Sequence, residues 1–299
     1  MKKFVIVTDS CSDLRKELRE QYDIDYIPMH MSYDGKELFA DLDFNEISYE
    51  DFFEMMRNGT RFTTAQITTS EYKERFEKYI SEGCDILSIS CSSALSASVK
   101  ASRIARDELL AKYPDSKIIC IDSLNSCSGL GLMCKIASRL RAQGKTIEET
   151  ANWIEENKLK ANQECTVEKL SYLKQAGRVS AMSAFFGGLL NVKPIIVSDA
   201  SGNNAAIEKV KGKKTAFDRI IERTVSEYDP TICKDVIFAH ADCYEDAVEL
   251  KRLFLEKVSV DEEDISIERI GPIIGASAGP GTVAIYFMGK EVTFDSKKA

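Results

Sequence analysis

The sequence lacks several features that mark whole classes of protein. No stretch approaches the roughly 18 uninterrupted apolar residues of a membrane-spanning helix, so we expect no stable membrane insertion. The opening apolar run, residues 4–7, is too short for a secretory signal, which favours a cytoplasmic location. Only 6 prolines occur among 299 residues, which excludes collagen-like chains. Only 2 histidines are present, and this scarcity restricts metal sites and histidine-dependent catalysis.

Cysteine and nucleotide-binding patterns are also incomplete. The 9 cysteines are an odd number without any Cys-x-x-Cys pair, which indicates neither a disulfide framework nor a zinc ribbon. The segment 129–134 lacks the third glycine of a dinucleotide fingerprint. The segment 212–215 imitates the end of a phosphate-binding loop, but Ile207 stands where the first glycine belongs. We therefore expect no metal and no cofactor.

Basic residues are fewer than acidic residues in this chain. Lys and Arg total 40 against 48 Asp and Glu, which gives a formal net charge of −8. A negative surface repels nucleic acids and anionic membranes, so we expect neither as a partner. Hydrophobic residues make up 44% of the chain, which is typical of a globular protein. A chain of 299 residues is long enough for about two domains.

The first half alternates short apolar runs with segments of helical periodicity. This alternation predicts an α/β fold in which residues 1–156 form a doubly wound, mostly parallel sheet. The expected strands are 3–7, 25–31, 85–90 and 117–121, and the expected helices are 14–22, 49–57, 69–82, a segment ending near 112, 130–143 and 147–156.

The second half follows a different order. Residues 157–299 predict a smaller α/β domain with a mixed sheet, because two runs around the turn at 199–204 indicate an antiparallel hairpin. The expected helices are 167–175, 182–190, 215–228 and 244–258, and the expected strands are 192–198, 205–211, 235–239, 265–270, 282–288 and 291–294.

Hydroxyl and carboxyl side chains follow three predicted strands of the first half. They are Thr8, Asp9 and Ser10, then Ser92 and Ser93, then Asp122 and Ser123. The carboxyl ends of parallel strands meet at one edge, where open α/β sheets bind ligands. Two interpretations stay open: a polar binding crevice, or ordinary helix caps, since Ser and Asp are preferred N-cap residues.

A hydrolase is an alternative hypothesis. His240 and Asp242 follow an apolar strand at a spacing that places both on one face, and Ser92 or Ser93 supplies a nucleophile. The sequence contains no Gly-x-Ser-x-Gly elbow, and Asp242 with Glu245 resembles a helix capping box. The hydrolase hypothesis is therefore the weaker one.

Two further segments have unusual composition. Residues 270–281 contain four glycines and two prolines, for which we predict a loop rather than a helix. Such a loop presents backbone N–H groups to an anion, or it simply crosses between strands. Lysines 209, 211, 213 and 214 form a basic cluster that is either a solvated face or a docking surface for an acidic partner.

Taken in order, seven segments resemble the motifs of the DegV family of bacterial fatty-acid-binding proteins. The resemblance covers nearly the whole chain, and seven short motifs in the same order are hard to obtain by chance. The segments are Thr8-Asp9-Ser10 with Asp13, residues 62–68, 92–99, Asp122-Ser123, residues 173–179, Lys193-Pro194-Ile195 and residues 271–281.

The resemblance implies a two-domain protein that binds one long-chain fatty acid, with its carboxylate at the domain junction and the second domain closing over the acyl chain. The residues implied for the carboxylate are Thr63, Thr64, Ser92, Ser93 and Ser277. Candidates for lining the acyl chain, unless they are plain core, are Ala181, Phe185, Phe186, Leu189 and Leu190.

The resemblance also implies a partner in place of an activity. Members of the family present the acyl chain to a separate dihydroxyacetone-kinase-like subunit, which phosphorylates the carboxylate with ATP. The chain is accordingly expected to be a lipid-binding subunit without a complete catalytic constellation of its own. Arg178, Lys211 and Lys213 are the residues that we expect to dock this partner.

One departure from the family pattern affects the ligand. Where the family has a histidine that helps to bind the carboxylate, this chain has Ser277. Serine can donate a hydrogen bond but cannot carry positive charge. The alternative to a fatty acid is therefore a different small anionic or lipid-like molecule on the same scaffold.

Overall fold

The structure is a computed structural model, and it describes residues 3–180 and 192–297. A parallel four-stranded sheet lies in the first half, as predicted. Its strands, in spatial order, are β2 (Ile24–Ile27), β1 (Phe4–Asp9), β6 (Asp85–Ser90) and β7 (Ile118–Asp122). All three pairings are parallel, and every residue of β6 is buried, as expected for a sheet covered on both faces.

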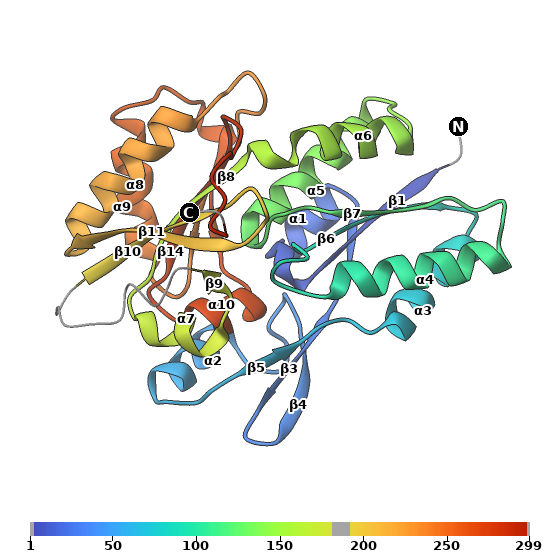
Figure 1. Cartoon of the computed structure of the whole chain (residues 1–299), viewed down its shortest axis with the longest axis horizontal. Helices are drawn as coiled ribbons and strands as arrows, with labels where there is room; N and C mark the ends of the chain where they lie inside the picture. The colour runs from blue at the N-terminus through green and yellow to red at the C-terminus, as the bar shows by residue number, and fades with distance from the viewer. Residues whose placement is uncertain (1–2, 181–191, 298–299) are drawn as a thin grey trace.

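Helices cover both faces of this sheet, which is the doubly wound arrangement that the alternation predicts (Figure 1). The pair α3 and α4 lies against β6 and β7, and the pair α5 and α6 packs on the sheet separately. The helices of the first half are α1 (Lys16–Gln21), α2 (Tyr49–Arg57), α3 (Thr69–Ser81), α4 (Ser98–Lys112), α5 (Cys127–Ala142) and α6 (Ile147–Asn157), with short 3₁₀ turns at η1 (Ser10–Ser12) and η2 (Lys158–Lys160).

A small antiparallel sheet that the sequence did not predict projects from the first half (Figure 1). Its spatial order is β4 (Lys36–Ala40), β3 (Met29–Tyr33) and β5 (Thr63–Ala65). The predicted strand 25–31 is divided at Pro28, which separates β2 from β3. Proline has no N–H to donate to a ladder, so the chain leaves one sheet at this point and enters another.

The second half forms a mixed seven-stranded sheet. Its spatial order is β13 (Ile265–Arg269), β12 (Val236–His240), β14 (Val283–Met288), β8 (Ala161–Thr166), β10 (Val192–Ser198), β11 (Asn204–Lys211) and β9 (Val179–Ser180). Helices α8 (Lys213–Glu227) and α9 (Tyr244–Leu255) pack on it, and η4 (Glu262–Asp264) leads into β13. The predicted hairpin is β10 with β11.

The strand predictions for this half contain two errors. Strand β8 was missed because its centre, Asn162 to Glu164, is polar and carries no apolar alternation. Glu164 is nevertheless buried, and the Arg223 guanidinium donates to both its carboxylate oxygens at 2.8–2.9 Å. The segment 291–294 forms no strand, although Asn162 does donate to the backbone carbonyl of Lys290 just before it.

The glycine-rich segment is also a correction. It forms a helix, α10 (Pro272–Ala278), where a loop was predicted. Proline stands at the first helical position, where its missing N–H costs nothing, and Gly279 ends the helix with φ of +82°. Close packing explains why the residue at position 275, inside the helix, is glycine. A Cβ there would be 2.9–3.0 Å from the rings of Phe53 and Phe52 on α2, which is too close for a larger residue.

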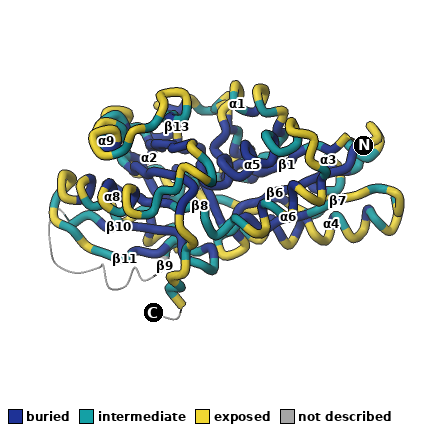
Figure 2. Tube along the Cα trace, turned by 90° about the horizontal axis from the view of Figure 1, so that it is seen from above, coloured by how far each residue is buried: buried dark blue, intermediate teal, exposed yellow. Residues whose placement is uncertain are grey.

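One core joins the two halves. Every residue of α5 from Cys127 to Ser138 is buried, because the helix packs against β1 and β6 of the parallel sheet and against β8 and β14 of the mixed sheet. The largest cluster of buried side chains accordingly runs through both halves, and a second cluster lies between α8, α9 and the mixed sheet. Figure 2 shows the buried strands enclosed by exposed helical faces.

We expect Gly275→Ala to destabilise the protein by about 1–3 kcal/mol, because the added methyl group forces α10 away from Phe52 and Phe53. Urea unfolding measures the change. Ser277→Ala on the same helix is the control, with an expected change within about 0.5 kcal/mol. Equal stability of Gly275→Ala and the wild type would contradict this account of the helix.

Candidate functional site

A cavity of about 450 Å³ lies where α10, α7 (Leu170–Ala176), β5 and the segment 91–97 come together, and we call it the junction cavity. Figure 1 shows α7, α10 and β5 gathered beneath the ends of the two large sheets. Its volume falls within the usual range for small-molecule sites. Three of the five predicted carboxylate residues line it, namely Thr64, Ser93 and Ser277.

Ser93 reaches the junction cavity because polar residues at the strand ends hold its loop. The Asp122 carboxylate accepts hydrogen bonds from the backbone N–H groups of Ser93 and Leu124, both at 3.1 Å. Ser92 is fully buried instead, and its hydroxyl accepts from the N–H of Ala94 at 3.2 Å. Helix α4, which was expected to end near residue 112, begins at Ser98, so Ser93 belongs to the loop before it.

Thr63 and Thr64 are neighbours on β5, and their side chains point to opposite faces because successive side chains of a strand alternate. The Thr63 hydroxyl is 2.7 Å from that of Ser32 on the neighbouring strand β3, and Thr63 does not line the junction cavity. Thr64 does line it. The structure therefore separates Thr63 from Thr64, and Ser92 from Ser93, a choice that the sequence left open.

Arg178 lines the junction cavity, although it was predicted as a docking residue. It follows Gly177, which ends α7 with φ of +63° and turns the chain toward β9. Its guanidinium donates one hydrogen bond, to the carbonyl of Ala176 at 2.7 Å. The Ser277 hydroxyl donates back to the carbonyl of Ile273 at 3.2 Å. The positive charge at the cavity thus comes from the residue after the turn that ends α7 and not from α10.

The predicted docking residues do not form one surface. β9 pairs with the Asn204 end of β11, whereas Lys211 is the last residue of β11. Seven residues of strand separate these ends by about 23 Å. Lys213 forms an ion pair with Asp246 of α9. Arg178 therefore lies at the junction cavity, and Lys211 and Lys213 lie at and just beyond the other end of β11.

The predicted acyl-chain residues lie outside the described part of the chain. They are Ala181, Phe185, Phe186, Leu189 and Leu190.

Sulfur atoms in the cavity wall were not anticipated. Cys11, Met29 and Cys91 line the junction cavity, with the Cys11 thiol 3.4 Å from the Met29 thioether. A hydrogen bond with Cys91 and burial raise the pKa of Cys11 well above its ordinary value, which keeps this thiol neutral and unreactive. The position of these cysteines in the sequence could have indicated their place, because Cys11 and Cys91 directly adjoin the polar motifs at two strand ends.

The comparisons with known proteins agree with this geometry. A protein-family model described as "Uncharacterised protein, DegV family" matches residues 3–290. The chain belongs to the DegV family. A DegV domain-containing protein from Clostridium perfringens is 38% identical over 293 residues, which cover 97% of this chain and 98% of the relative.

Solved structures of the DegV family share the fold. A DegV lipid-binding protein from Thermotoga maritima has a TM-score of 0.84 and 26% identity, and the match covers 97% of this chain and 100% of that one. A second Thermotoga maritima protein, described as revealing a fatty acid binding function, has a TM-score of 0.82 with the same identity and coverage. The family resemblance and the two-domain α/β fold predicted from the sequence are thereby confirmed.

The residues of the hydrolase hypothesis are not assembled in this DegV-family chain. His240 and Asp242 line a different cavity from Ser93, one that is lined by the start of α2 and by Gly271, the N-cap of α10. Burial, with the nearby Arg269 charge, lowers the pKa of His240 to about 4, and its Nδ1 accepts from the N–H of Cys243 at 3.3 Å. Asp242 does not cap α9, whose N-cap is Cys243.

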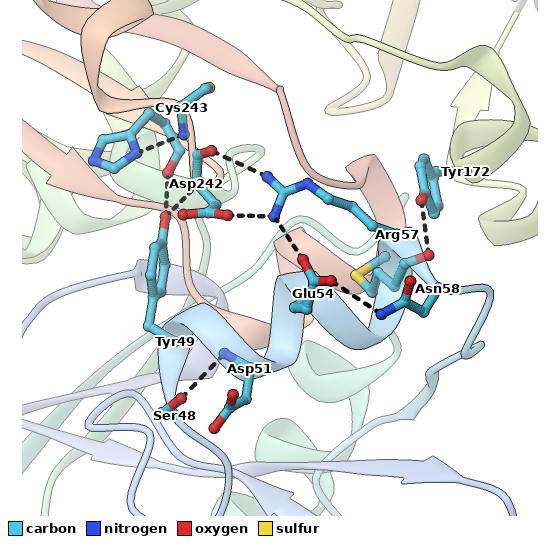
Figure 3. A network of polar contacts seen from close by, with 11 residues as sticks. Ser48, Tyr49, Asp51, Glu54, Arg57, Asn58, Tyr172, Asp242 and Cys243 are labelled. Carbon is cyan, nitrogen blue, oxygen red and sulfur yellow. Dashed lines mark hydrogen bonds and ion pairs between the residues drawn. The ribbon is translucent and has the colours of Figure 1, made fainter.

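Asp242 instead belongs to a network that ties α2 to the end of β12 (Figure 3). Arg57 forms an ion pair with the Asp242 carboxylate and donates to its backbone carbonyl at 3.2 Å. The Tyr49 hydroxyl donates to the His240 carbonyl at 2.9 Å and accepts from the Asp242 N–H at 2.8 Å. This network and the α10 contact both hold the second half against α2.

Two carboxylates near the end of β1, Asp9 and Asp13, contact the backbone of neighbouring segments and do not line the junction cavity. Asp9 accepts from the N–H groups of Cys11 at 2.9 Å and Cys91 at 2.8 Å, so it joins the ends of β1 and β6. Burial raises the pKa of Asp9 to about 6 and that of Asp13 to about 7. Asp13 lies directly beside Gly271, the N-cap of α10.

Within the described residues, His, Cys, Asp and Glu form no group of three or more suited to a metal ion. Every helix in the same part of the chain is too short or too polar to cross a membrane.

The raised pKa of Asp13 predicts a specific pH dependence. Between the ordinary value of 3.8 and about 7, the folded protein holds a proton that the unfolded chain releases. The stability contributed by Asp13 is therefore complete at low pH and declines as the pH rises through this window. We expect Asp13→Asn, which stays neutral, to gain stability relative to the wild type as the pH increases.

Urea unfolding at several pH values between about 4 and 8 measures this difference. Asp115→Asn, at an exposed turn residue, is the control, and we expect its difference in stability from the wild type to stay constant over this pH range. A constant difference between Asp13→Asn and the wild type would show that Asp13 does not change its protonation in this range.

Proposed function

We propose that this chain binds one long-chain fatty acid, with the carboxylate in the junction cavity at the boundary of the two halves. The observation that carries the proposal is the lining of this cavity. Hydroxyl groups of Thr64, Ser93 and Ser277 and the Arg178 guanidinium meet there with apolar side chains from α7 and α10. A cavity that combines an anion-binding group with apolar walls suits an amphiphilic acid.

The carboxylate is bound by neutral donors and one cation. The Ser277 hydroxyl proton is directed to Ile273, which leaves Thr64 and Ser93 as the hydroxyl donors and Arg178 as the charge. A guanidinium binds a carboxylate through two parallel N–H groups, and such charge-assisted bonds are stronger than neutral ones. Arg178 thus supplies the positive charge that Ser277 lacks.

The acyl chain supplies most of the affinity, at about 0.8 kcal/mol for each buried CH₂ group. The apolar wall of the junction cavity consists of aliphatic side chains, such as Leu173 and Ile273, together with the sulfur-containing side chains of Cys11, Met29 and Cys91. Neutral sulfur atoms are polarisable and apolar, so they favour a hydrocarbon chain over a polar ligand.

In the same proposal the chain acts in the cytoplasm as a presenting subunit and not as an enzyme. A separate dihydroxyacetone-kinase-like subunit phosphorylates the bound carboxylate with ATP. Two observations support a binding role without catalysis: similarity to a solved DegV protein described as revealing a fatty acid binding function, and the separation of Ser93 from His240 into different cavities. The kinase-like partner comes from the family resemblance alone.

Native mass spectrometry of gently purified protein tests the ligand. We expect a near-stoichiometric long-chain acid in the wild type. Ser93→Ala and Arg178→Ala should each weaken its retention by about tenfold, because each removes a direct donor to the carboxylate. Ser259→Ala, at an exposed serine distant in sequence from the cavity residues, is the control. An empty protein would contradict the fatty-acid proposal. A different small molecule bound at stoichiometry would contradict it as well and would favour the alternative, a different anionic or lipid-like ligand.

Reconstitution with the purified kinase-like subunit and ATP tests presentation. We expect Lys211→Glu and Lys213→Glu to slow acyl phosphate formation while leaving the bound fatty acid in place, because reversed charge weakens docking to an acidic partner. Lys257→Glu at the end of α9 is the matched control. Unchanged rates in both lysine variants would remove this cluster from the partner interface.

A further inference from the structure

The turn that joins β10 to β11, residues 199–203, packs against the first half of the chain, and we call it the hairpin turn. Its Gly202 is buried and has φ of +77°, a backbone conformation that favours glycine. A Cβ at this position would be 2.2 Å from the Ser92 hydroxyl oxygen and 3.0 Å from the Leu124 Cα. Two separate reasons, the backbone angle and the close contact, therefore require glycine here.

The two residues that Gly202 touches belong to the loops that hold Ser93. Ser92 directly precedes Ser93, and its N–H donates to the Asn125 carbonyl at 2.9 Å. Leu124 has φ of +54°, which is uncommon for a residue with a bulky side chain. The Asp122 carboxylate accepts hydrogen bonds from the N–H groups of both Leu124 and Ser93, so one acceptor joins the two loops. A shift of either loop is therefore passed on to Ser93.

The hairpin turn is itself held in shape by hydrogen bonds. The Asp199 carboxylate accepts from the backbone N–H groups of Ser201 at 3.0 Å and Asn203 at 2.8 Å. The Ser296 N–H donates to the same carboxylate at 3.2 Å, and the Ser296 hydroxyl donates to it as well. The turn thus has a fixed shape where it meets the first half of the chain.

The hairpin turn also leads directly to the junction cavity. Asn204, the first residue of β11, lines this cavity together with Ser93. The Asn204 side-chain oxygen accepts from the Gln163 amide at 3.2 Å, which connects the end of the turn to β8. Gly202 does not line the junction cavity, so any effect of this residue on a ligand must act through the loops that it touches.

We propose that Gly202 is a positioning residue for the ligand: its close contact with Ser92 and Leu124 sets the place of the Ser93 hydroxyl in the junction cavity. This inference rests on the proposed function, in which Ser93 donates a hydrogen bond to the carboxylate. The second half of the chain thereby determines the geometry of a donor that the first half supplies.

A double-mutant cycle tests whether Gly202 acts through Ser93. The affinity of delipidated protein for hexadecanoate is measured by isothermal titration in the wild type, Gly202→Ala, Ser93→Ala and the double variant. We expect Gly202→Ala to weaken binding by at least about fivefold in the wild type but by less than about twofold in the Ser93→Ala background, because the displaced hydroxyl is then already absent. Losses that multiply in full would indicate a general structural effect and would overturn the inference.

Gly144→Ala is the matched control, because Gly144 has φ of +83° and no neighbouring atom within 4 Å. It introduces the same kind of backbone strain without the contact, so we expect its affinity for hexadecanoate to stay within about twofold of the wild type. Addition of Ser92→Ala removes the hydroxyl that the new methyl group of Gly202→Ala meets. We expect this second change to restore the affinity of Gly202→Ala by at least about threefold, and no recovery would contradict the proposed contact.

A milder variant covers the case in which Gly202→Ala does not fold, which urea unfolding detects. Ser296→Ala adds no atoms and removes a hydrogen bond from Asp199. We expect it to weaken hexadecanoate binding by about twofold to threefold in the wild type and to have no effect in the Ser93→Ala background. Equal losses in both backgrounds would overturn the inference.

Amide hydrogen exchange of the ligand-free protein separates this inference from the proposed function. We expect the N–H groups of Ser93 and Ala94 to exchange at least about fivefold faster in Gly202→Ala than in Gly144→Ala, because the first variant displaces their loop. Equal exchange in the two glycine variants would overturn the inference. Failure of the wild type to bind hexadecanoate would overturn the proposed function, while the exchange rates would still show whether the hairpin turn holds the Ser93 loop.

Discussion

The contact between α10 and α2 determines where the site forms. Gly275 allows α10 to lie directly against Phe52 and Phe53, with no side chain of its own in between. This close approach brings Ser277 to the junction cavity, which Thr64 also lines, although 213 residues of sequence separate them. The junction cavity is bounded by α10 and α7, so a displaced α10 would open it. The hydrogen bonds of Tyr49 at the start of α2 and the ion pair of Arg57 at its end with Asp242 strengthen the same junction.

Polar residues at the strand ends act mainly as supports for the few that face the ligand. Asp9 joins the ends of β1 and β6 through two backbone N–H groups, and Asp122 holds the loop that presents Ser93. The helix-cap interpretation is wrong for the following α-helices, because the N-caps of α1, α4 and α5 are Arg15, Ala97 and Ser126; Asp9 caps only the short turn η1. The binding crevice stays a prediction. Asp9 and Asp122 fix the backbone, whereas Ser93 lines the cavity. Burying Asp9 and Asp13 raises the pKa of each, and the protein accepts this cost where the strand ends must be held rigidly.

The accuracy of the sequence predictions follows the strength of the local signal. Helix α2 and strands β6 and β10 match their predicted bounds, because each has a clear apolar period and sharp ends. Strand β8 was missed because the ion pair of its buried Glu164 with Arg223 is formed by residues distant in sequence. Helix α10 was predicted as a loop because the glycine inside it, Gly275, is explained only by the rings of Phe52 and Phe53 on α2, which are distant in sequence. Likewise, the motif containing Arg178 was recognised, but its place at the cavity depends on the turn at Gly177 and the pairing of β9 with β11.

The family resemblance implies a histidine at the position of Ser277, and this difference has another meaning once the cavity is described. In the sequence, a serine at this position cannot carry the positive charge that a histidine would bring to the expected carboxylate site. In the structure, Ser277 directs its hydroxyl to Ile273, and three cations without ion pairs among the described residues, Arg61, Lys169 and Arg178, surround the space next to it. An arginine keeps its charge at every physiological pH, whereas a histidine loses most of it near neutrality. An anion held in this way would bind with little dependence on pH between about 6 and 8, and its affinity would instead depend on ionic strength. A serine at position 277 is therefore compatible with an anionic head group, because Lys169 and Arg178, which flank α7, and Arg61 after α2 provide positive charge in its place.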